Sequence, residues 1–513
     1  MKRAGFPRLH MKKQSFLKGA VIISAGGIAA KILGAFYRIP LANLLGGQGM
    51  GVYQMVYPLY CLLLTLSATG IPAGLARIVS RRAADGQEVR GVLFSALSLF
   101  CAVGAAGSLV MFLAAPLFAA AQGEPAAASA YRALAPSVFF VSAISCVRGW
   151  FQGRSSFLPT ALSEVLEQLV KVGLGLALPA LFPARAVQMS LLAVTASEFA
   201  ACAWLLLQCR QRRPLYRERA GRVSPPQLLR VTVPVAVAAG VLPLSNIIES
   251  ILIVRIVGSY AANATALYGL YAGSAVTLIN LPVSVCYGIA AAIVPSVSAA
   301  QVTGGAAAAE RRALQAAKYT LFIALPSAAF LFAFAGQTAR FLYPSVAGEE
   351  GEMLAALIRA LSGGAALLSL VQTFSAVLTG RGKPKVAALS MTAACAVKLA
   401  LEAVLLRDAQ ISVLGAAYAS LGCYFVALLV NLLYSIREAK NRLRFLRHAA
   451  GFSLAAAGCV CAALPAARVH VLLALAVSAA VYLAVTFLGG AFSARELDLF
   501  RRKKHDPYHR LGV

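Results

Sequence analysis

The stretch FLKGAVIISAGGIAAKILGAFYRIPLANLL, residues 16–45, decides the fold class. It is long enough to cross a bilayer as a helix, yet it contains Lys31 and Arg38. The two cations are seven residues apart, which is close to two helical turns, so they share one face. A cation in hydrocarbon costs at least about 2.5–3.5 kcal/mol. We therefore expect this face to line a wet cavity that accepts a negatively charged ligand.

The composition predicts a polytopic membrane protein. Of the 513 residues, 60% are hydrophobic and 13% are charged, and no hydrophilic segment is long enough for a soluble domain. The basic N-terminus and the apolar run after it raise the alternative of a cleaved signal peptide. We interpret the run as a first membrane span instead, because it is too long and contains Lys31 and Arg38.

Apolar runs of about 20 residues predict fourteen transmembrane helices. The Gly- and Pro-containing ends of the second and eighth runs predict bent segments there. The ranges are Phe16–Leu45, Met50–Pro72, Val92–Ala120, Tyr131–Phe151, Leu158–Phe182, Ala186–Leu207, Leu228–Val257, Leu267–Val297, Tyr319–Leu342, Met353–Leu378, Val386–Leu406, Ile411–Ile436, Ala449–Ala467 and Val471–Leu488.

The basic residues predict the orientation. With a cytoplasmic N-terminus, 35 of the 47 Lys and Arg residues fall on the cytoplasmic side, six on the other side and six within spans. Such a bias places both termini in the cytoplasm and requires an even number of spans. Most of the net charge of +29 thus reflects topology and attraction to anionic membrane lipids. The basic residues are spread over every cytoplasmic loop, so we expect no nucleic-acid partner.

The sequence predicts a six-helix unit that occurs twice in the chain. Pairs such as Gly70-Ile71 with Gly288-Ile289 and Val170-Lys171 with Val397-Lys398 recur at offsets that rise from 212 to 227 along the chain. An even-numbered unit inserts the same way up both times, so we expect two parallel lobes. The predicted domains are residues 1–222, residues 223–447 and a final two-helix hairpin with a basic tail, residues 448–513.

Several motifs carry a resemblance to a known family. They are AKILG (30–34), YRIP (37–40), GVYQM (51–55), RGWFQGR (148–154), EQLVK (167–171) and GRGKPK (380–385). With them the chain resembles the multidrug/oligosaccharidyl-lipid/polysaccharide exporter superfamily. Within it, the chain is similar to the polysaccharide biosynthesis proteins typified by stage V sporulation protein B, relatives of the MurJ-type lipid II flippases.

The resemblance implies two lobes around a central cavity, alternating access and a polyprenyl-diphosphate-linked saccharide as cargo. It also implies that cations of the first helix line the cavity and that the last two helices form a groove for the lipid tail. Lys31 matches the first such cation, whereas Arg38 is displaced by about one position from the second, and the range Met50–Pro72 lacks the charges that the lipid II branch has there.

The residues themselves indicate a similar chemistry. Lys31 and Arg38 can bind phosphate oxygens, and Gly34 between them would let a head group approach. We also expect Gln54 and Arg255 to contact substrate, with gating or snorkelling as the alternatives for Arg255. The alternative for the cations is pairing with buried carboxylates.

Carboxylates within the spans are candidates for gating or for binding a coupling proton or sodium ion. Glu249 falls beside the position of Arg38 in the repeat, which predicts a Glu249–Arg38 pair across the lobe interface. Glu164, Glu167 and Lys171 share one face, with Glu167–Lys171 an i,i+4 pair and Arg148 a partner for Glu164.

Lys398 and Glu402 form a second i,i+4 pair, which we interpret, like the Glu167–Lys171 pair, as structural. Glu198 has no evident partner in the sequence.

No catalytic constellation is evident, because all five histidines lie in tails or loop ends and no Walker loop is present. We therefore expect a transporter rather than an enzyme, without a cofactor, and the ten cysteines show no metal-binding spacing. The alternative function is an ion-coupled antiporter of drugs or organic cations. Expected partners are a lipid-linked oligosaccharide, membrane lipids and cell-wall synthesis enzymes, and the expected location is the bacterial plasma membrane.

Overall fold

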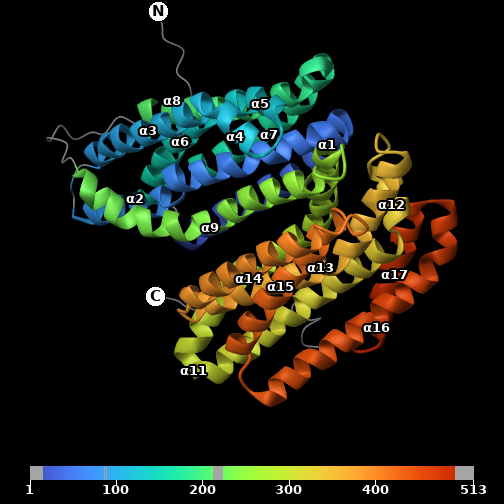
Figure 1. The fold of residues 1–513 in the computed structure, drawn as a ribbon. Coiled ribbons are helices and arrows are strands. Elements are labelled where there is room, and N and C mark those ends of the chain that lie inside the picture. Colours follow the sequence, from blue (N-terminus) through green and yellow to red (C-terminus); the bar gives the residue numbers. More distant parts are fainter. Residues whose placement is uncertain (1–15, 86, 88, 212–222, 492–513) are drawn as a thin grey trace, which may run out of the picture.

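The computed structural model describes residues 16–85, 87, 89–211 and 223–491. The described chain is helical throughout, as the sequence predicts, with no β-strand in it. Its helices form two bundles that lie side by side (Figure 1). The N-terminal bundle comprises α1 to α8 and the C-terminal bundle comprises α10 to α15. Helix α9 packs against α1 on one side and against α14 on the other.

The N-terminal bundle consists of eight α-helices and three short turns. The turns are η1 (Thr65–Thr69), which is π-helical, and the 3₁₀ turns η2 (Pro125–Ala127) and η3 (Pro183–Arg185). The helices are α1 (Phe16–Leu64), α2 (Ile71–Ala84), α3 (Arg90–Leu113), α4 (Ala115–Ala121), α5 (Ala128–Leu134), α6 (Pro136–Gly153), α7 (Leu158–Leu181) and α8 (Ala186–Gln211).

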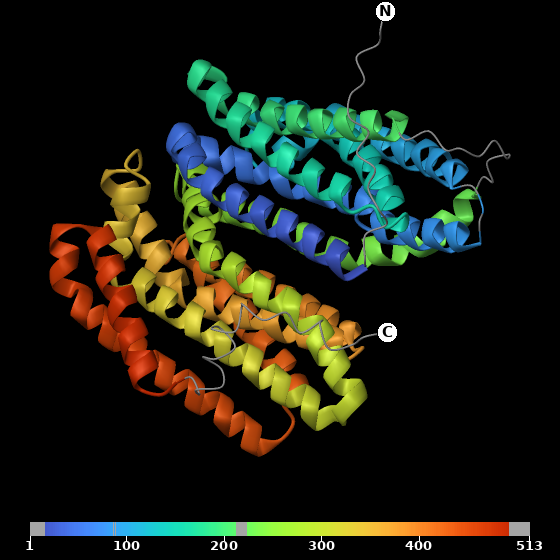
Figure 2. The same ribbon diagram turned by 180° about the vertical axis from the view of Figure 1, so that it is seen from behind.

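The remaining helices follow α9 (Pro225–Val257). They are α10 (Ala264–Tyr268), the π-helical turn η4 (Gly269–Ala275), α11 (Val276–Ala333), α12 (Ala335–Leu342), α13 (Gly348–Gly380), α14 (Pro384–Leu405), α15 (Leu414–Ser435), α16 (Ala439–Val469) and α17 (Val471–Leu488). Helices α16 and α17 form a hairpin on the side of the C-terminal bundle away from the N-terminal bundle (Figure 2).

Eleven helical stretches among the described residues are long and apolar enough to cross a membrane, by length and composition. Helix α1 carries most of two predicted spans because it bends at Gly46, whose φ of 65° favours glycine. Helix α11 likewise carries most of two predicted spans, because it bends at Gly304 and Gly305. The second and eighth ranges each contain a π-helical turn, η1 and η4, and the bent segments expected in these ranges stay predictions. The count of fourteen spans and the orientation of the termini remain predictions.

The hydrophobic core shows where the two bundles meet. One cluster joins both bundles at a single end, with Met50, Leu134, Tyr343 and Ile358 among its buried members. At the other end each bundle has a core of its own, around Trp150 in the N-terminal bundle and around Phe374 in the C-terminal bundle. The joined end carries the loops that we predict to be extracellular. The bundles are therefore closed at that end and have separate cores at the predicted cytoplasmic end.

Backbone-to-backbone packing seals the joined end. Gly51 of α1 lies directly against the carbonyl of Thr265, and Gly269 of η4 lies against the backbone of Gly47 and Gly51. Only glycine allows two helix backbones to approach so closely. Beside this contact, Asn43 Nδ2 donates to the carbonyl oxygen of Leu342 at 2.7 Å.

Candidate functional site

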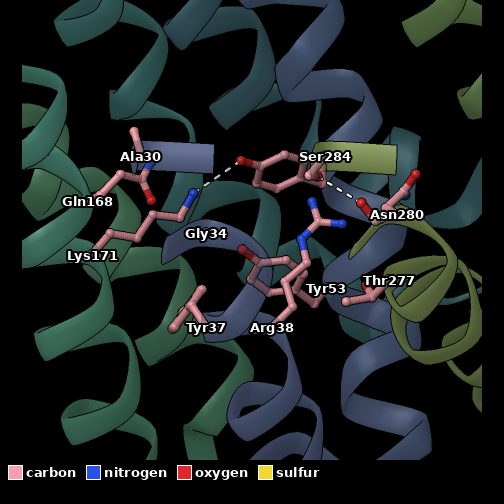
Figure 3. Close-up of a pocket in the computed structure, with 11 residues that line it drawn as sticks. Ala30, Gly34, Tyr37, Arg38, Tyr53, Gln168, Lys171, Thr277, Asn280 and Ser284 are labelled. Atoms are coloured by element: carbon pink, nitrogen blue, oxygen red, sulfur yellow. Dashed lines mark hydrogen bonds between the residues drawn. The ribbon is translucent and has the colours of Figure 1, made fainter. Parts of the chain in front are cut away.

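Two adjoining pockets lie between the bundles and share Arg38, Tyr57 and Asn280 in their walls. The first, which we call the N-side pocket, has a volume of about 310 Å³ and is lined mainly by α1, α7 and α11 (Figure 3). The second, the C-side pocket, has a volume of about 460 Å³ and is lined by α1, α9, α10, η4, α11, α13, α14 and α15. We call the two together the central chamber.

The N-side pocket has a cationic wall. Arg38 and Lys171 line it, and none of the described residues lining it is a carboxylate. The other polar groups are amides and hydroxyls, namely Tyr37, Tyr53, Tyr57, Gln168, Thr277, Asn280 and Ser284. Gln168 Oε1 is buried without a hydrogen-bond partner among the described residues. The wall thus offers positive charge and hydrogen-bonding groups to a ligand that is negative and hydroxylated.

Arg38 projects into the N-side pocket between Tyr53 and Asn280 (Figure 3). It is partly buried and forms no ion pair with a described carboxylate. The predicted Glu249–Arg38 pair is therefore wrong, because Glu249 is bound by Lys398 instead. Lys31 lies in α1, but its side chain lies outside the part of the chain that the structure describes.

Lys171 reaches the same pocket from α7. Its Nζ donates to Tyr57 Oη at 3.2 Å and lies 5.5 Å from the centre of that ring (Figure 3). The predicted Glu167–Lys171 pair is wrong, because Arg148 Nη2 binds Glu167 Oε2 at 2.9 Å. The predicted Arg148–Glu164 pair is also wrong, because Arg148 binds Glu167 instead. Glu167 thus pairs across helices, which leaves the Lys171 ammonium to face the chamber.

The C-side pocket contains a charged cluster of three residues. Lys398 Nζ lies 2.6 Å from Glu249 Oε1 and 3.8 Å from Glu402 Oε1, and Tyr271 Oη donates to Glu249 Oε1 at 2.8 Å. The predicted Lys398–Glu402 contact is confirmed, but Glu249 of α9 is the nearer partner. Glu249 and Lys398 line the pocket, whereas Glu402 lies behind them with 0% of its side chain exposed.

The other predicted residues occupy different places. Gly34 lines the N-side pocket, where a Cβ would contact Gln168 Oε1 at 3.4 Å. Gln54 lines the C-side pocket, and its Nε2 donates to the Ala272 carbonyl oxygen at 3.2 Å. Arg255 lines neither pocket.

The guanidinium of Arg255 donates to the carbonyl oxygens of Ala120 and Ala121 at the end of α4. It acts there as a helix C-terminal cation. Glu198, for which the sequence suggests no partner, accepts a hydrogen bond from Tyr60 Oη at 3.2 Å.

Sequence reasoning missed the tyrosines of the chamber and, apart from Gln54, its amides. Tyr53 and Tyr57 are four residues apart on α1, with ring centres 5.7 Å apart, and Asn280 and Ser284 are four apart on α11. This helical spacing of polar groups within an apolar run was available as a signal, since polar side chains in a span favour a wet face. No described group of three His, Cys, Asp or Glu side chains is placed to hold a metal ion.

The comparisons agree with this architecture. A family model described as polysaccharide biosynthesis protein matches residues 16–301. Stage V sporulation protein B of Bacillus subtilis (strain 168) is 28% identical, over 65% of this chain and 68% of its own. Lipid II flippase MurJ of the same organism is 24% identical, over 82% of this chain and 83% of its own.

Two solved structures share the fold. The structure of "Lipid II flippase MurJ, inward closed conformation" matches with a TM-score of 0.74 and 14% identity, over 94% of this chain and 100% of that chain. An inward-facing multidrug resistance MATE family transporter of the MOP superfamily matches with a TM-score of 0.69 and 17% identity, over 84% of this chain and 98% of that chain. The chain shares its fold with solved transporters of the MOP superfamily, and it is a multi-pass membrane protein that belongs to the polysaccharide biosynthesis protein family.

Proposed function

We propose that this protein is a flippase that carries a polyprenyl-diphosphate-linked saccharide from the cytoplasmic to the outer leaflet of a bacterial plasma membrane by alternating access. The observation that carries the proposal is the pair Arg38 and Lys171. Both cations line a chamber between two bundles, and neither forms an ion pair with a described carboxylate. A cation at membrane depth is stable only if water or a ligand solvates it.

The chemistry of the head group fits the chamber. A lipid diphosphate cannot cross about 30 Å of hydrocarbon unaided, because its charged oxygens lose their hydration. Arg38 can bind phosphate oxygens through two parallel N–H bonds, and Lys171 can add a point charge. Gln168, Asn280 and Ser284 offer hydrogen-bonding partners for sugar hydroxyls nearby.

The packing of the bundles supports alternating access. The bundles share one core at the predicted outer end and have separate cores at the predicted cytoplasmic end. This arrangement corresponds to a state that receives cargo from the cytoplasm. An inside-negative potential of 100 mV contributes about 2.3 kcal/mol for each negative charge that moves outward. The potential can therefore drive an anionic cargo in the export direction.

The alternative of an organic-cation antiporter needs an acidic chamber. Glu249 is the one carboxylate among the described residues that line the chamber, and the Lys398 ammonium already neutralises it. The lining therefore favours an anionic cargo. The names of the two Bacillus subtilis relatives point in the same direction, and lipid II is accordingly the first cargo to test.

The decisive experiment is a flipping assay in proteoliposomes with fluorescent lipid II, with and without an imposed potential. We expect Arg38→Ala and Lys171→Met each to lower the flipping rate about tenfold or more, because a hydrogen bond to a charged group contributes about 1.5–3 kcal/mol. Arg38→Lys should retain part of the rate, because it keeps the charge but loses the bidentate geometry.

Arg255→Ala is the matched control, because this arginine lines neither pocket, and it should flip at the wild-type rate. Wild-type rates for both Arg38→Ala and Lys171→Met would contradict the head-group role. A wild-type protein that moves no lipid-linked saccharide at any potential would contradict the proposed function itself.

A further inference from the structure

The Lys171 ammonium is held in the N-side pocket by a neutral group (Figure 3). Its Nζ donates to Tyr57 Oη at 3.2 Å, and none of the described residues that line this pocket is a carboxylate. Tyr57 also lines the C-side pocket, so it lies where the two pockets adjoin. A neutral acceptor solvates an ammonium without cancelling its charge, whereas a carboxylate cancels it. The charge of Lys171 is therefore available to a ligand in the chamber.

The hydroxyl of Tyr57, rather than the face of its ring, makes the main contact with the ammonium. Lys171 Nζ is 3.2 Å from Oη but 5.5 Å from the centre of the ring, so the nitrogen lies much closer to the hydroxyl oxygen. The hydrogen bond therefore holds the ammonium, and the attraction to the ring adds little at that distance. A phenylalanine at this position would keep the ring and remove the hydrogen bond.

Neighbouring rings on α1 fix the orientation of Tyr57. The Tyr53 ring is stacked on it, with ring centres 5.7 Å apart and 18° between the planes. The Tyr60 ring meets it edge-on, with centres 5.5 Å apart, and Tyr60 is itself buried with its hydroxyl bonded to Glu198. Packing on two sides holds the Tyr57 ring in one rotamer. Its hydroxyl is therefore a fixed acceptor, toward which the flexible side chain of Lys171 reaches.

Glu167 competes with Tyr57 for the ammonium. It precedes Lys171 by four residues on α7, the spacing at which a glutamate and a lysine attract each other on one helix face. Arg148 binds Glu167 Oε2 at 2.9 Å, but a carboxylate has two oxygens, so one guanidinium does not exclude a second cation. If Lys171 turned to Glu167, the N-side pocket would lose one of its two cations, and Arg38 would remain alone among the described residues of its wall.

We propose that Tyr57 is a positioning residue, which holds the Lys171 ammonium in the N-side pocket against the pull of Glu167 and so sets the affinity of the chamber for an anionic head group. The proposal rests on the proposed function for the nature of the ligand. An ammonium has three N–H donors, and Lys171 gives one of them to Tyr57. A phosphate oxygen that enters the pocket therefore binds an ammonium that is already in place, and little side-chain entropy is lost on binding.

A double-mutant cycle tests this role. The full-length protein in detergent is titrated calorimetrically with farnesyl diphosphate, a soluble probe that carries the prenyl diphosphate group. We expect Tyr57→Phe to weaken binding about fivefold or more, because the ammonium loses the hydrogen bond that holds it in the pocket. In a protein that already carries Lys171→Met, Tyr57→Phe should weaken binding no further, because the group that the hydroxyl holds is absent. A merely structural role of Tyr57 would weaken binding in both backgrounds.

Removal of the competing carboxylate gives a second, independent prediction. Glu167→Gln keeps an acceptor for Arg148 but no longer attracts Lys171. Combined with Tyr57→Phe, it should recover most of the lost affinity, and alone it should bind the probe at least as tightly as the wild type. Tyr418→Phe is the matched control, because this tyrosine is 47% exposed on α15 and lines neither pocket. It should bind the probe like the wild type.

The results separate the role of Tyr57 from the proposed function. Equal affinities of the wild type and Tyr57→Phe would overturn the positioning role and leave the flippase proposal intact. Equal losses from Tyr57→Phe with and without Lys171→Met would also overturn it, because the hydroxyl would then act without Lys171. A Tyr57→Phe defect that Glu167→Gln leaves unchanged would refute the competition with Glu167. If the wild type binds no diphosphate at all, both this inference and the proposed function fail.

Discussion

At the scale of single residues, the charges within the spans separate into those with partners and those without. Arg148 and Glu167 bind each other, and Glu249 binds Lys398. Arg38 has no such partner among the side chains that the structure describes. The helical spacing of the sequence places these residues at membrane depth, but three of its partner assignments are wrong. Glu167 binds Arg148 of a neighbouring helix rather than Lys171 of its own. Glu249 binds Lys398 of α14 rather than Arg38 of α1.

The Arg148–Glu167 pair is predicted to stabilise the N-terminal bundle. Its side chains are 17% and 18% exposed, so Arg148→Met leaves a largely buried carboxylate unpaired. We expect a loss of about 3 kcal/mol, seen as a lower melting temperature of the detergent-solubilised protein. Arg148→Met combined with Glu167→Gln should recover part of that loss, because the unpaired charge is gone. A single mutant that melts like the wild type would show that the pair contributes nothing.

At the scale of helices, the contact between α1 and η4 sets how closely the bundles approach. Gly51 and Gly269 allow the two backbones to touch, because a side chain at either position would overlap the opposite backbone. The predicted repeat offset of 218 relates these two glycines to each other, so we expect the seal at the joined end to be built from equivalent positions of the two predicted lobes. Helix α1 bends at Gly46, shortly before Gly51, and Gly269 opens the π-helical turn η4.

Gly51→Ala is expected to prevent this closure. Its Cβ would overlap the carbonyl oxygen of Thr265, which is backbone and cannot move aside without moving α10. We expect the variant to lose flipping activity and to melt at a lower temperature. Gly173→Ala in α7 is the matched control, because a Cβ there meets nothing within 4 Å, and it should behave as the wild type or be slightly more stable. Normal flipping by Gly51→Ala would mean that the seal is not required.

At the scale of the whole molecule, the topology is a prediction of the charge distribution. The loop between α13 and α14 carries Arg381 and Lys383, and Lys385 follows in the first turn of α14, whereas the one basic residue in the loop after α14 is Arg407. The positive-inside rule therefore places the first loop in the cytoplasm and the second outside.

Epitope tags at the two ends of α14 test this orientation in the full-length protein. A tag after Ala409 should be accessible to antibody in intact spheroplasts, and a tag after Gly382 should become accessible only after permeabilisation. Both positions lie in exposed or open loops, so a tag disturbs little packing. The reverse pattern would invert the molecule and with it the direction of transport.

The sequence alone determined the fold class, the helical segments, the family and the presence of a cationic face on the first helix, because hydropathy, helical spacing and motifs are local properties of the chain. The tertiary structure decided which charges are neutralised. Lys171 faces the chamber because Arg148 binds Glu167, and Arg38 lacks a carboxylate partner among the described residues because Lys398 binds Glu249. Such pairings depend on how each helix is rotated about its axis against its neighbours, and long-range packing, not the order of residues along one helix, sets that rotation.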